Sequence, residues 1–337
     1  MTSLSFLVAV AVVGTAVVWV GSDALEGASG RLGRHYGFPR VIQGAILAAI
    51  GSSAPEIASA IIATVRYGEF ELGVGVIVGS AVFNILVIPA LAALLSDGAL
   101  DTGRDVVYKE AQFYMLSVAV LFLAFALAVI YYPIEGTGDL EGLITRPLAF
   151  SLLALYGLYV FVQYLDVSER DVPTETLSRR SLLREWGLLV GGVVLIIAGV
   201  EGLVFSAVGL GEIFETPSFL WGLTVVAAAT SLPDALISIS AARIDEPAVS
   251  LGNVLGSNVF DLLVAIPAGV LLAGATPVSF TAAVPMMAFL VVATIVLFAF
   301  ARTGMEITDR EATTMLLLYA VFVAWLLLES IGVVDIV

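Results

Sequence analysis

The sequence predicts an all-α integral membrane protein with ten transmembrane helices in two inverted five-helix repeats. The chain has 337 residues, of which 60% are hydrophobic and only 13% are charged, and its mean hydropathy is +1.07. A soluble domain cannot bury so much apolar surface, whereas a protein with several membrane spans requires it. Two short polar motifs occur once in each half of the chain, which predicts the repeat.

Ten stretches are long and apolar enough to cross a bilayer as helices, since each crossing takes about 20 apolar residues. They are residues 3–28, 40–65, 71–97, 112–133, 145–165, 184–209, 218–243, 248–273, 279–302 and 312–333. The longest polar connection, residues 166–183, divides the chain into a first repeat at 1–165 and a second at 184–337. No basic segment precedes the first stretch, and it has no small-residue cleavage signature. We therefore expect it to be a retained span and not a signal peptide.

The basic residues predict the orientation. Twelve of the fourteen Lys and Arg residues fall in odd-numbered connections, and only Arg66 and Arg146 fall in even-numbered ones. Because positive residues favour the cytoplasmic side, we expect a multi-pass protein of the cell membrane with both termini outside and the 166–183 loop in the cytoplasm. The net charge is −15, and the sequence offers no basic patch for nucleic acid.

The paired motifs define the repeat. Residues 51–56 read GSSAPE and residues 229–234 read ATSLPD, while residues 79–84 read GSAVFN and residues 256–261 read GSNVFD. The last residues of the two motifs are 28 positions apart in the first half and 27 in the second, and the halves are offset by 177 or 178. Since five spans is an odd number, the second copy has to be inverted. Inverted repeats are typical of secondary transporters, whose sites lie near the bilayer midplane on discontinuous helices.

The acids in these motifs indicate cation binding. The small residues alone favour close helix packing, and a proline alone can be a simple kink. Glu56, Asp234 and Asp261 differ, because an ionised carboxylate at the midplane costs at least ~2.5 kcal/mol. No Lys or Arg falls deep within a predicted span to pair with them. We therefore predict that a cation from solution supplies the counter-charge.

The predicted ligands are all hard oxygen atoms. Pro55 and Pro233 each remove a backbone donor, and we expect this to break the helix and free carbonyls one turn back. The predicted ligands are the carboxylates of Glu56, Asp234 and Asp261, the amide of Asn84, the hydroxyls of Ser52, Ser53, Ser80, Thr230, Ser231 and Ser257, and the carbonyls of Ala49 and Ala227. Ca²⁺ prefers about six to eight such oxygens, and Na⁺ or K⁺ accepts the same donors. Zinc, copper or iron would favour Cys or His, but the chain has no cysteine and a single histidine, His35.

With these motifs the sequence resembles the cation/calcium exchanger superfamily, and it is most similar to the K⁺-dependent Na⁺/Ca²⁺ exchangers. The resemblance implies antiport by alternating access, with spans 1 and 6 sliding over a stationary core. It also implies that Glu56 and Asp234 hold Ca²⁺ and that Asp261 helps to bind a monovalent ion. The short 166–183 loop has no counterpart of the large regulatory domain of animal Na⁺/Ca²⁺ exchangers.

The predicted function is a secondary antiporter that exchanges Ca²⁺ for Na⁺, with K⁺ as a further candidate ion. A Ca²⁺/H⁺ antiporter and a passive cation channel are the alternatives. We expect a monomer without a bound cofactor, and no enzyme, since the sequence has no nucleotide-binding loop and no nucleophile with a base. If all three acids are ionised in one site, a single Ca²⁺ leaves an uncompensated negative charge, which a proton or a K⁺ at Asp261 would balance.

Three further acids lie on the first and sixth predicted spans. We expect Asp23 and Glu26 to mark the cytoplasmic end of the first span, with a role in the ion path as the alternative. Glu201 lies deeper in its span, and both interpretations stay open for it.

Overall fold

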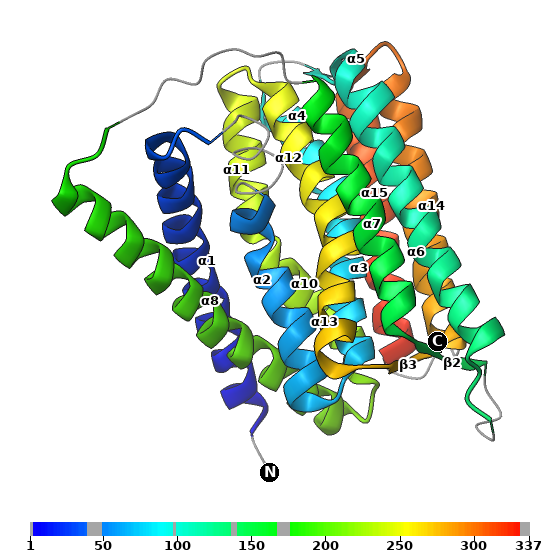
Figure 1. Ribbon diagram of the computed structural model, residues 1–337. Coiled ribbons are helices and arrows are strands. Elements are labelled where there is room, and N and C mark those ends of the chain that lie inside the picture. The colour runs from blue at the N-terminus through cyan, green and yellow to red at the C-terminus, as the bar shows by residue number, and fades with distance from the viewer. Residues whose placement is uncertain (1–2, 39–48, 97–98, 136–139, 167–175, 331–337) are drawn as a thin grey trace.

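The computed structural model describes residues 3–38, 49–96, 99–135, 140–166 and 176–330 (Figure 1). The elements of the first half are α1 (Leu4–His35), α2 (Ala49–Ile62), η2 (Ala63–Tyr67), α3 (Phe70–Leu86), α4 (Ile88–Leu95), β1 (Leu100–Asp101), α5 (Gly103–Asp105), η3 (Val106–Glu110), α6 (Ala111–Tyr131), β2 (Glu141–Ile144) and α7 (Arg146–Asp166). Those of the second half are α8 (Arg179–Phe214), α9 (Ser218–Trp221), η4 (Gly222–Val226), α10 (Ala227–Thr230), α11 (Leu232–Arg243), α12 (Pro247–Phe260), η5 (Asp261–Ala265), α13 (Ile266–Ala273), β3 (Thr276–Ser279), α14 (Phe280–Arg302), β4 (Glu306–Ile307) and α15 (Asp309–Ser330). The η elements are π-helical turns that continue neighbouring helices.

Most of the predicted spans are present as long apolar helices. Within the described ranges, eight helices are long and apolar enough to cross a membrane, and a ninth candidate is the pair Ser218–Thr230 and Leu232–Arg243, bent by 44°. The second predicted stretch, residues 40–65, is described only from Ala49 onward, where α2 and η2 are helical. The structure therefore confirms a mostly helical protein with many candidate spans, and its described part stops short of ten.

Four short strands modify the all-α prediction. β1 pairs with β4, and β2 pairs with β3, both antiparallel, so each sheet joins a strand of the first half to one of the second. The β2–β3 sheet lies at the end of the bundle where α1 begins (Figure 1). We call this the N-terminal end, and we call the opposite end, where α7 ends and α8 begins, the linker end. The strands are only two to four residues long, so they tie connections together without changing the helical architecture.

Two helical segments form the centre of the bundle. In the most apolar stretch of Phe70–Leu95, 89% of the residues are buried inside the protein, and in that of Pro247–Ala273 the share is 78%. The corresponding shares are only 17% for α7 and 22% for α15. In lipid, helices associate through close packing of small residues. Gly79 of α3 shows this, because a Cβ atom there would overlap the carbonyl oxygen of Leu223 in η4. The two central segments carry the GSAVFN and GSNVFD motifs.

α1 and α8 form a separate antiparallel pair, the α1–α8 pair. Each helix contacts the other more extensively than it contacts any other element, and the two cross beside the main bundle (Figure 1). Gly14 faces Gly199 and Gly21 faces Gly192, and a Cβ on any of the four would lie within 2.9 Å of the partner's carbonyl oxygen. The backbones therefore touch directly, which makes the pair a tightly packed unit.

Candidate ion-binding site

The predicted side-chain ligands meet in the interior of the bundle, on α2, α3, α10–α11 and α12–η5. Each has at most 2% of its surface exposed. They are Ser52, Ser53, Glu56, Ser80, Asn84, Thr230, Ser231, Asp234, Ser257 and Asp261. The structure thus collects in one buried region residues that are up to 209 positions apart in the sequence.

Hydroxyl contacts join the two halves. Ser52 Oγ and Ser257 Oγ are 3.0 Å apart, and Ser231 Oγ donates a hydrogen bond to Ser80 Oγ over 2.7 Å. Each contact links a serine of the proline motif in one half to the serine that follows glycine in the second motif of the other half. The four motifs therefore converge.

The Glu56 and Asp234 carboxylates have different partners. Glu56 Oε1 accepts a hydrogen bond from Ser80 Oγ at 3.4 Å, and the Thr230 hydroxyl also interacts with this carboxylate. Asp234 Oδ2 accepts one from Asn84 Nδ2 at 3.2 Å, and Asp234 Oδ1 accepts from Ser257 Oγ and Asn253 Nδ2, each at 3.4 Å. Asp234 also lies in the first turn of α11, where the helix dipole stabilises a negative charge by about 0.3–1 kcal/mol.

Several buried oxygen atoms have no hydrogen-bond partner among the described residues. They are Ser53 Oγ, Glu56 Oε2, Asn84 Oδ1 and both carboxylate oxygens of Asp261. Buried polar atoms are almost always paired, so such a group calls for an explanation. None of the ion pairs found among the described residues involves Glu56, Asp234 or Asp261. Unpaired oxygens of this kind are the ligands that a hard cation takes.

The three acids do not form one cluster. Within the described ranges, no three Asp, Glu or His side chains lie close enough to hold a single metal ion together. Asp261 is nevertheless close enough to Glu56 and Asp234 for their charges to act on its own, so one site carrying all three charges stays a prediction. The arrangement favours neighbouring ion positions, each built from one or two carboxylates and neutral oxygens.

The two prolines act differently. Pro233 lies just after Ser231, where α10 ends and α11 begins at the 44° bend, as a helix breaker predicts. Pro55 lies inside α2, which continues through it from Ala49 to Ile62, so the predicted break is absent there. Only the second half thus has a discontinuous helix at its proline.

The carbonyl ligands need a correction. The Ala227 carbonyl accepts hydrogen bonds from Ser231 N at 3.0 Å and from Thr230 Oγ1 at 3.2 Å, so Pro233 does not free it. A proline removes the donor for the carbonyl four residues back, which is Ala229 here and Gly51 for Pro55. Ala49 is the first helical residue of α2, two positions before Gly51.

Two asparagines belong to the site but were not among the predicted ligands. Asn258 Oδ1 accepts a hydrogen bond from Asn84 Nδ2 at 3.0 Å, and its own Nδ2 donates to the Ala81 carbonyl. Asn253 donates to Asp234 and, at 3.2 Å, to Ser238 Oγ. A signal was available, since Asn253 lies four residues before Ser257 and therefore shares its helix face.

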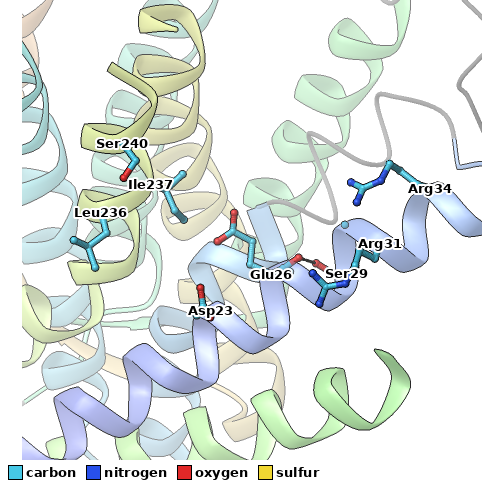
Figure 2. A pocket seen from close by; sticks show the side chains of 10 residues that line it. Asp23, Glu26, Ser29, Arg31, Arg34, Leu236, Ile237 and Ser240 are labelled. Atoms are coloured by element: carbon cyan, nitrogen blue, oxygen red, sulfur yellow. Dashed lines mark hydrogen bonds between the residues drawn. The ribbon is translucent and has the colours of Figure 1, made fainter. Parts of the chain in front are cut away.

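A cavity of about 610 Å³ approaches the site from the linker end. Asp23 and Glu26 of α1 line it opposite Ile237 and Ser240 of α11, and the Glu26 side chain extends into this space (Figure 2). The Cα, Cβ and Cγ atoms of Glu26 also lie 3.4–3.6 Å from where a Cβ of Gly51 would be, next to the GSSAPE motif. α1 continues to His35, so the helix extends beyond these acids, and their place at the cytoplasmic end of the span stays a prediction. Their position favours the ion-path interpretation.

The family model described as sodium/calcium exchanger protein matches residues 6–165 and 184–328. The chain belongs to this family. It is 31% identical over 268 residues to the Escherichia coli inner membrane protein YrbG, covering 77% of each chain. It is 26% identical to the sodium/calcium exchanger MaX1 of Methanosarcina acetivorans, covering 96% of this chain and 98% of that protein. A solved structure of the sodium–calcium exchanger NCX_Mj matches the fold with a TM-score of 0.63 at 24% identity, over 96% of this chain and 99% of the other.

Membership of this exchanger family agrees with the apolar helices of the structure. The apolar helices make the protein a multi-pass membrane protein. The match covers both halves of the chain and leaves out residues 166–183, the polar connection between them.

Proposed function

We propose that the protein is a secondary antiporter that exchanges Ca²⁺ for Na⁺ across the membrane by alternating access. The observation that carries this proposal is the buried set of oxygen atoms contributed by both halves, in which Glu56, Asp234 and Asp261 have no basic partner among the described residues. Desolvated carboxylates of this kind need compensating positive charge. The family membership supports the choice of Ca²⁺ and Na⁺.

The test is Ca²⁺ uptake into vesicles that contain the purified protein, with Na⁺, K⁺ and pH gradients imposed separately. We expect an outward Na⁺ gradient to drive Ca²⁺ uptake, and uptake to stop when Na⁺ is removed. Uptake driven by a pH gradient alone would identify a Ca²⁺/H⁺ antiporter. Ca²⁺ flux that needs no counter-ion would identify a passive channel and refute exchange.

We also propose ten spans in two inverted repeats. β1 of the first half corresponds to β3 of the second, and β2 corresponds to β4. Exchanging the two halves therefore turns the β1–β4 pair into the β3–β2 pair, as a two-fold axis requires. Gly14 and Gly192 are 178 residues apart, as are Gly21 and Gly199, so the same exchange converts the Gly14–Gly199 contact into the Gly192–Gly21 contact. This self-complementary pattern is typical of a two-fold relationship.

The π-helical turns support the same alignment. The offset between the halves is 178 at Glu56 and Asp234, but 177 at the starts of α3 and α12, and 178 again at the starts of α4 and α13. A π-helical turn adds one residue to a helix. η2 lies where the offset falls, and η5 lies where it rises again.

K⁺ is proposed as an additional transported ion at Asp261. Both oxygens of this buried carboxylate are unpaired among the described residues, and the first half has neutral Asn84 at the matching position. A single carboxylate suits a monovalent ion, because one K⁺ balances its charge. All proposed ligands come from one chain, so we propose a functional monomer without a bound cofactor.

The proposed orientation places the linker end in the cytoplasm and both termini outside. It rests on the distribution of basic residues. The chain has no cysteine, so a single Ser178→Cys substitution at the exposed start of α8 gives a clean reporter. We expect a membrane-impermeant thiol reagent to label it only from the cytoplasmic side, and labelling from outside intact cells would reverse the orientation.

A further inference from the structure

A polar contact ties the α1–α8 pair to the main bundle near the N-terminal end. Arg66 Nη1 of η2 lies 3.1 Å from Glu201 Oε2 of α8, and the Tyr67 hydroxyl donates a hydrogen bond to Glu201 Oε1 over 2.7 Å. η2 continues α2, which carries Glu56. The contact therefore joins the helix of the first ion-binding motif to the α1–α8 pair.

Both charged partners have counterparts in the other half. Asp23 precedes Glu201 by 178 residues, the offset that also relates the facing glycines of the α1–α8 pair. Arg66 precedes Arg243 by 177 residues, the offset that applies beyond η2. The second pair, Asp23 and Arg243, lies near the linker end, on α1 and at the end of α11.

The second pair is apart in this structure. Neither Asp23 nor Arg243 forms an ion pair with any residue that the structure describes. Asp23 lines the cavity at the linker end, and so does Ser240 of α11 (Figure 2). Arg243 lies about one helical turn beyond Ser240 on α11 and lines a second cavity at this end, together with Asp101 of β1. A movement of α1 towards the end of α11 would bring Asp23 and Arg243 closer together.

The cavity at the linker end is deeper than the cavity at the N-terminal end. This agrees with an ion pair that is formed at the N-terminal end and absent between Asp23 and Arg243. At the N-terminal end, a cavity of about 580 Å³ extends along α8 as far as Val208, whose counterpart in α1 is Gly30. The linker-end cavity continues past Gly30 to Asp23, two helical turns further. The N-terminal cavity stops the same two turns short of Glu201, where the contact with Arg66 and Tyr67 lies.

We propose that these residues form two alternating latches. The Arg66–Glu201 latch closes the N-terminal end in the conformation described, and an Asp23–Arg243 latch closes the linker end in the opposite conformation. The proposal rests on the alternating-access function proposed above. The latches are unequal, because the counterpart of Tyr67 is Ile244, which has no hydroxyl. The first latch therefore has one hydrogen bond more, which favours the conformation open at the linker end.

Cross-linking tests the latch that is open in this structure. In the cysteine-free chain, the variant Asp23→Cys/Arg243→Cys is treated with a bifunctional thiosulfonate about as long as an arginine side chain, which forms a reducible disulfide with each cysteine. We expect an intramolecular cross-link that stops Ca²⁺ exchange and a reducing agent that restores it. The matched control, Asp23→Cys/Arg310→Cys, keeps one reporter and moves the other to the start of α15. Absence of a cross-link, or unchanged exchange in the cross-linked protein, would overturn the proposal.

Accessibility tests the latch that is closed. A Ser240→Cys reporter measures how open the linker-end cavity is. Adding Glu201→Gln should shift molecules towards the opposite conformation and slow thiol labelling of this reporter by about threefold, in keeping with a partly exposed ion pair. Glu212→Gln is the control, since it removes the same charge from α8 at an exposed position. The reversed pair Arg66→Glu/Glu201→Arg should restore the wild-type rate.

The outcomes separate the latch from the proposed function. Equal labelling rates in the Glu201→Gln and Glu212→Gln proteins, with Na⁺-driven exchange intact, would overturn the latch and leave the antiporter in place. A protein that carries only the reporter and labels normally, but does not exchange Ca²⁺ for Na⁺, would refute the antiporter itself.

Discussion

Glu56 and Asp234 occupy equivalent positions in the two halves, yet their surroundings differ. Glu56 interacts with two hydroxyl groups, those of Ser80 at 3.4 Å and of Thr230, and its second oxygen is unpaired among the described residues. Both oxygens of Asp234 accept hydrogen bonds. The donors are Asn84, Asn253 and Ser257. Asp is one methylene shorter than Glu, and amide groups reach its carboxylate from two helices.

The difference indicates a division of labour between the halves. A carboxylate held by several donors is already oriented before an ion arrives, which lowers the cost of binding. In the proposed exchanger, the less restrained Glu56 would be the ligand that adjusts to ions of different size and charge. The helices that carry the two acids also differ between the halves. α2 is continuous through Pro55, whereas the chain of the second half bends between α10 and α11, just before Pro233.

The strongest test removes each carboxylate in turn. We expect Glu56→Gln and Asp234→Asn each to reduce Ca²⁺ exchange by at least about 100-fold, because a neutral amide cannot balance a divalent ion in a desolvated site. Both proteins should insert and fold, since removing a charge eases membrane insertion. The measurement is initial-rate Ca²⁺ flux in vesicles, with size-exclusion chromatography as the check on folding.

The control for this test is Glu135→Gln, which removes an exposed acid from the connection after α6 and should leave the flux unchanged. Near wild-type flux in either site variant would show that the corresponding carboxylate is not a ligand. A loss in one variant alone would mean that only one half binds Ca²⁺ directly.

The motif glycines give a second comparison, of stability. A Cβ on Gly79 would overlap the Leu223 carbonyl, so we expect Gly79→Ala to destabilise the protein by about 2 kcal/mol or more. The nearest atom to a Cβ on Gly256 is the Tyr159 hydroxyl at 3.7 Å, an ordinary contact. Gly256→Ala should therefore stabilise its helix by roughly 0.5–1 kcal/mol. Thermal unfolding in detergent measures both, and equal shifts would contradict the packing difference.

Much of this architecture follows from residue patterns. The length of the apolar stretches predicts the membrane helices, and the paired motifs predict that residues 51–56 and 256–261 lie in one site. Both signals can be seen in short stretches of sequence: hydrophobic residues recur along each helix, and each acid lacks a basic partner within its span. The four motifs do converge. Pro233 marks a true bend because it coincides with the helix boundary at Ser231.

Other features depend on three-dimensional contacts that a linear pattern does not contain. The α2 helix tolerates Pro55, and the Ala227 carbonyl is occupied by Thr230 and Ser231, although the sequence around each proline looks alike. The spacing of hydroxyl and amide groups between the carboxylates appears only when the helices are packed. Asn253 was overlooked because its equivalent position in the first half is Val76, so the repeat does not point to it.

A third test concerns Asp261 and its counterpart Asn84. We expect K⁺ to stimulate Ca²⁺ exchange by the wild type severalfold, and Asp261→Asn to exchange at a K⁺-independent rate, since the variant makes the halves alike at this position. The measurement is initial-rate Ca²⁺ flux with K⁺ replaced by a large inert cation, in both proteins. Wild-type exchange that ignores K⁺ would defeat the proposal and leave protonation of Asp261 as the means of balancing its charge.

The remaining test concerns Asn253, which makes Asp234 unlike Glu56. Asn253→Ala removes one donor from Asp234, and a hydrogen bond to a charged group is worth about 1.5 kcal/mol, so we expect the Ca²⁺ KM to rise roughly tenfold. The maximal rate should change little, because the carboxylate itself remains. Ser238→Ala is the matched control, since it removes the other hydrogen-bond partner of Asn253 and leaves every donor to Asp234 in place. A tenfold rise in both variants would indicate a general loss of packing around α11, whereas an unchanged KM in Asn253→Ala would show that Asp234 does not need this donor. A selective rise in Asn253→Ala would establish that the second half holds its carboxylate in advance of the ion, which is the distinction between the halves that the structure indicates.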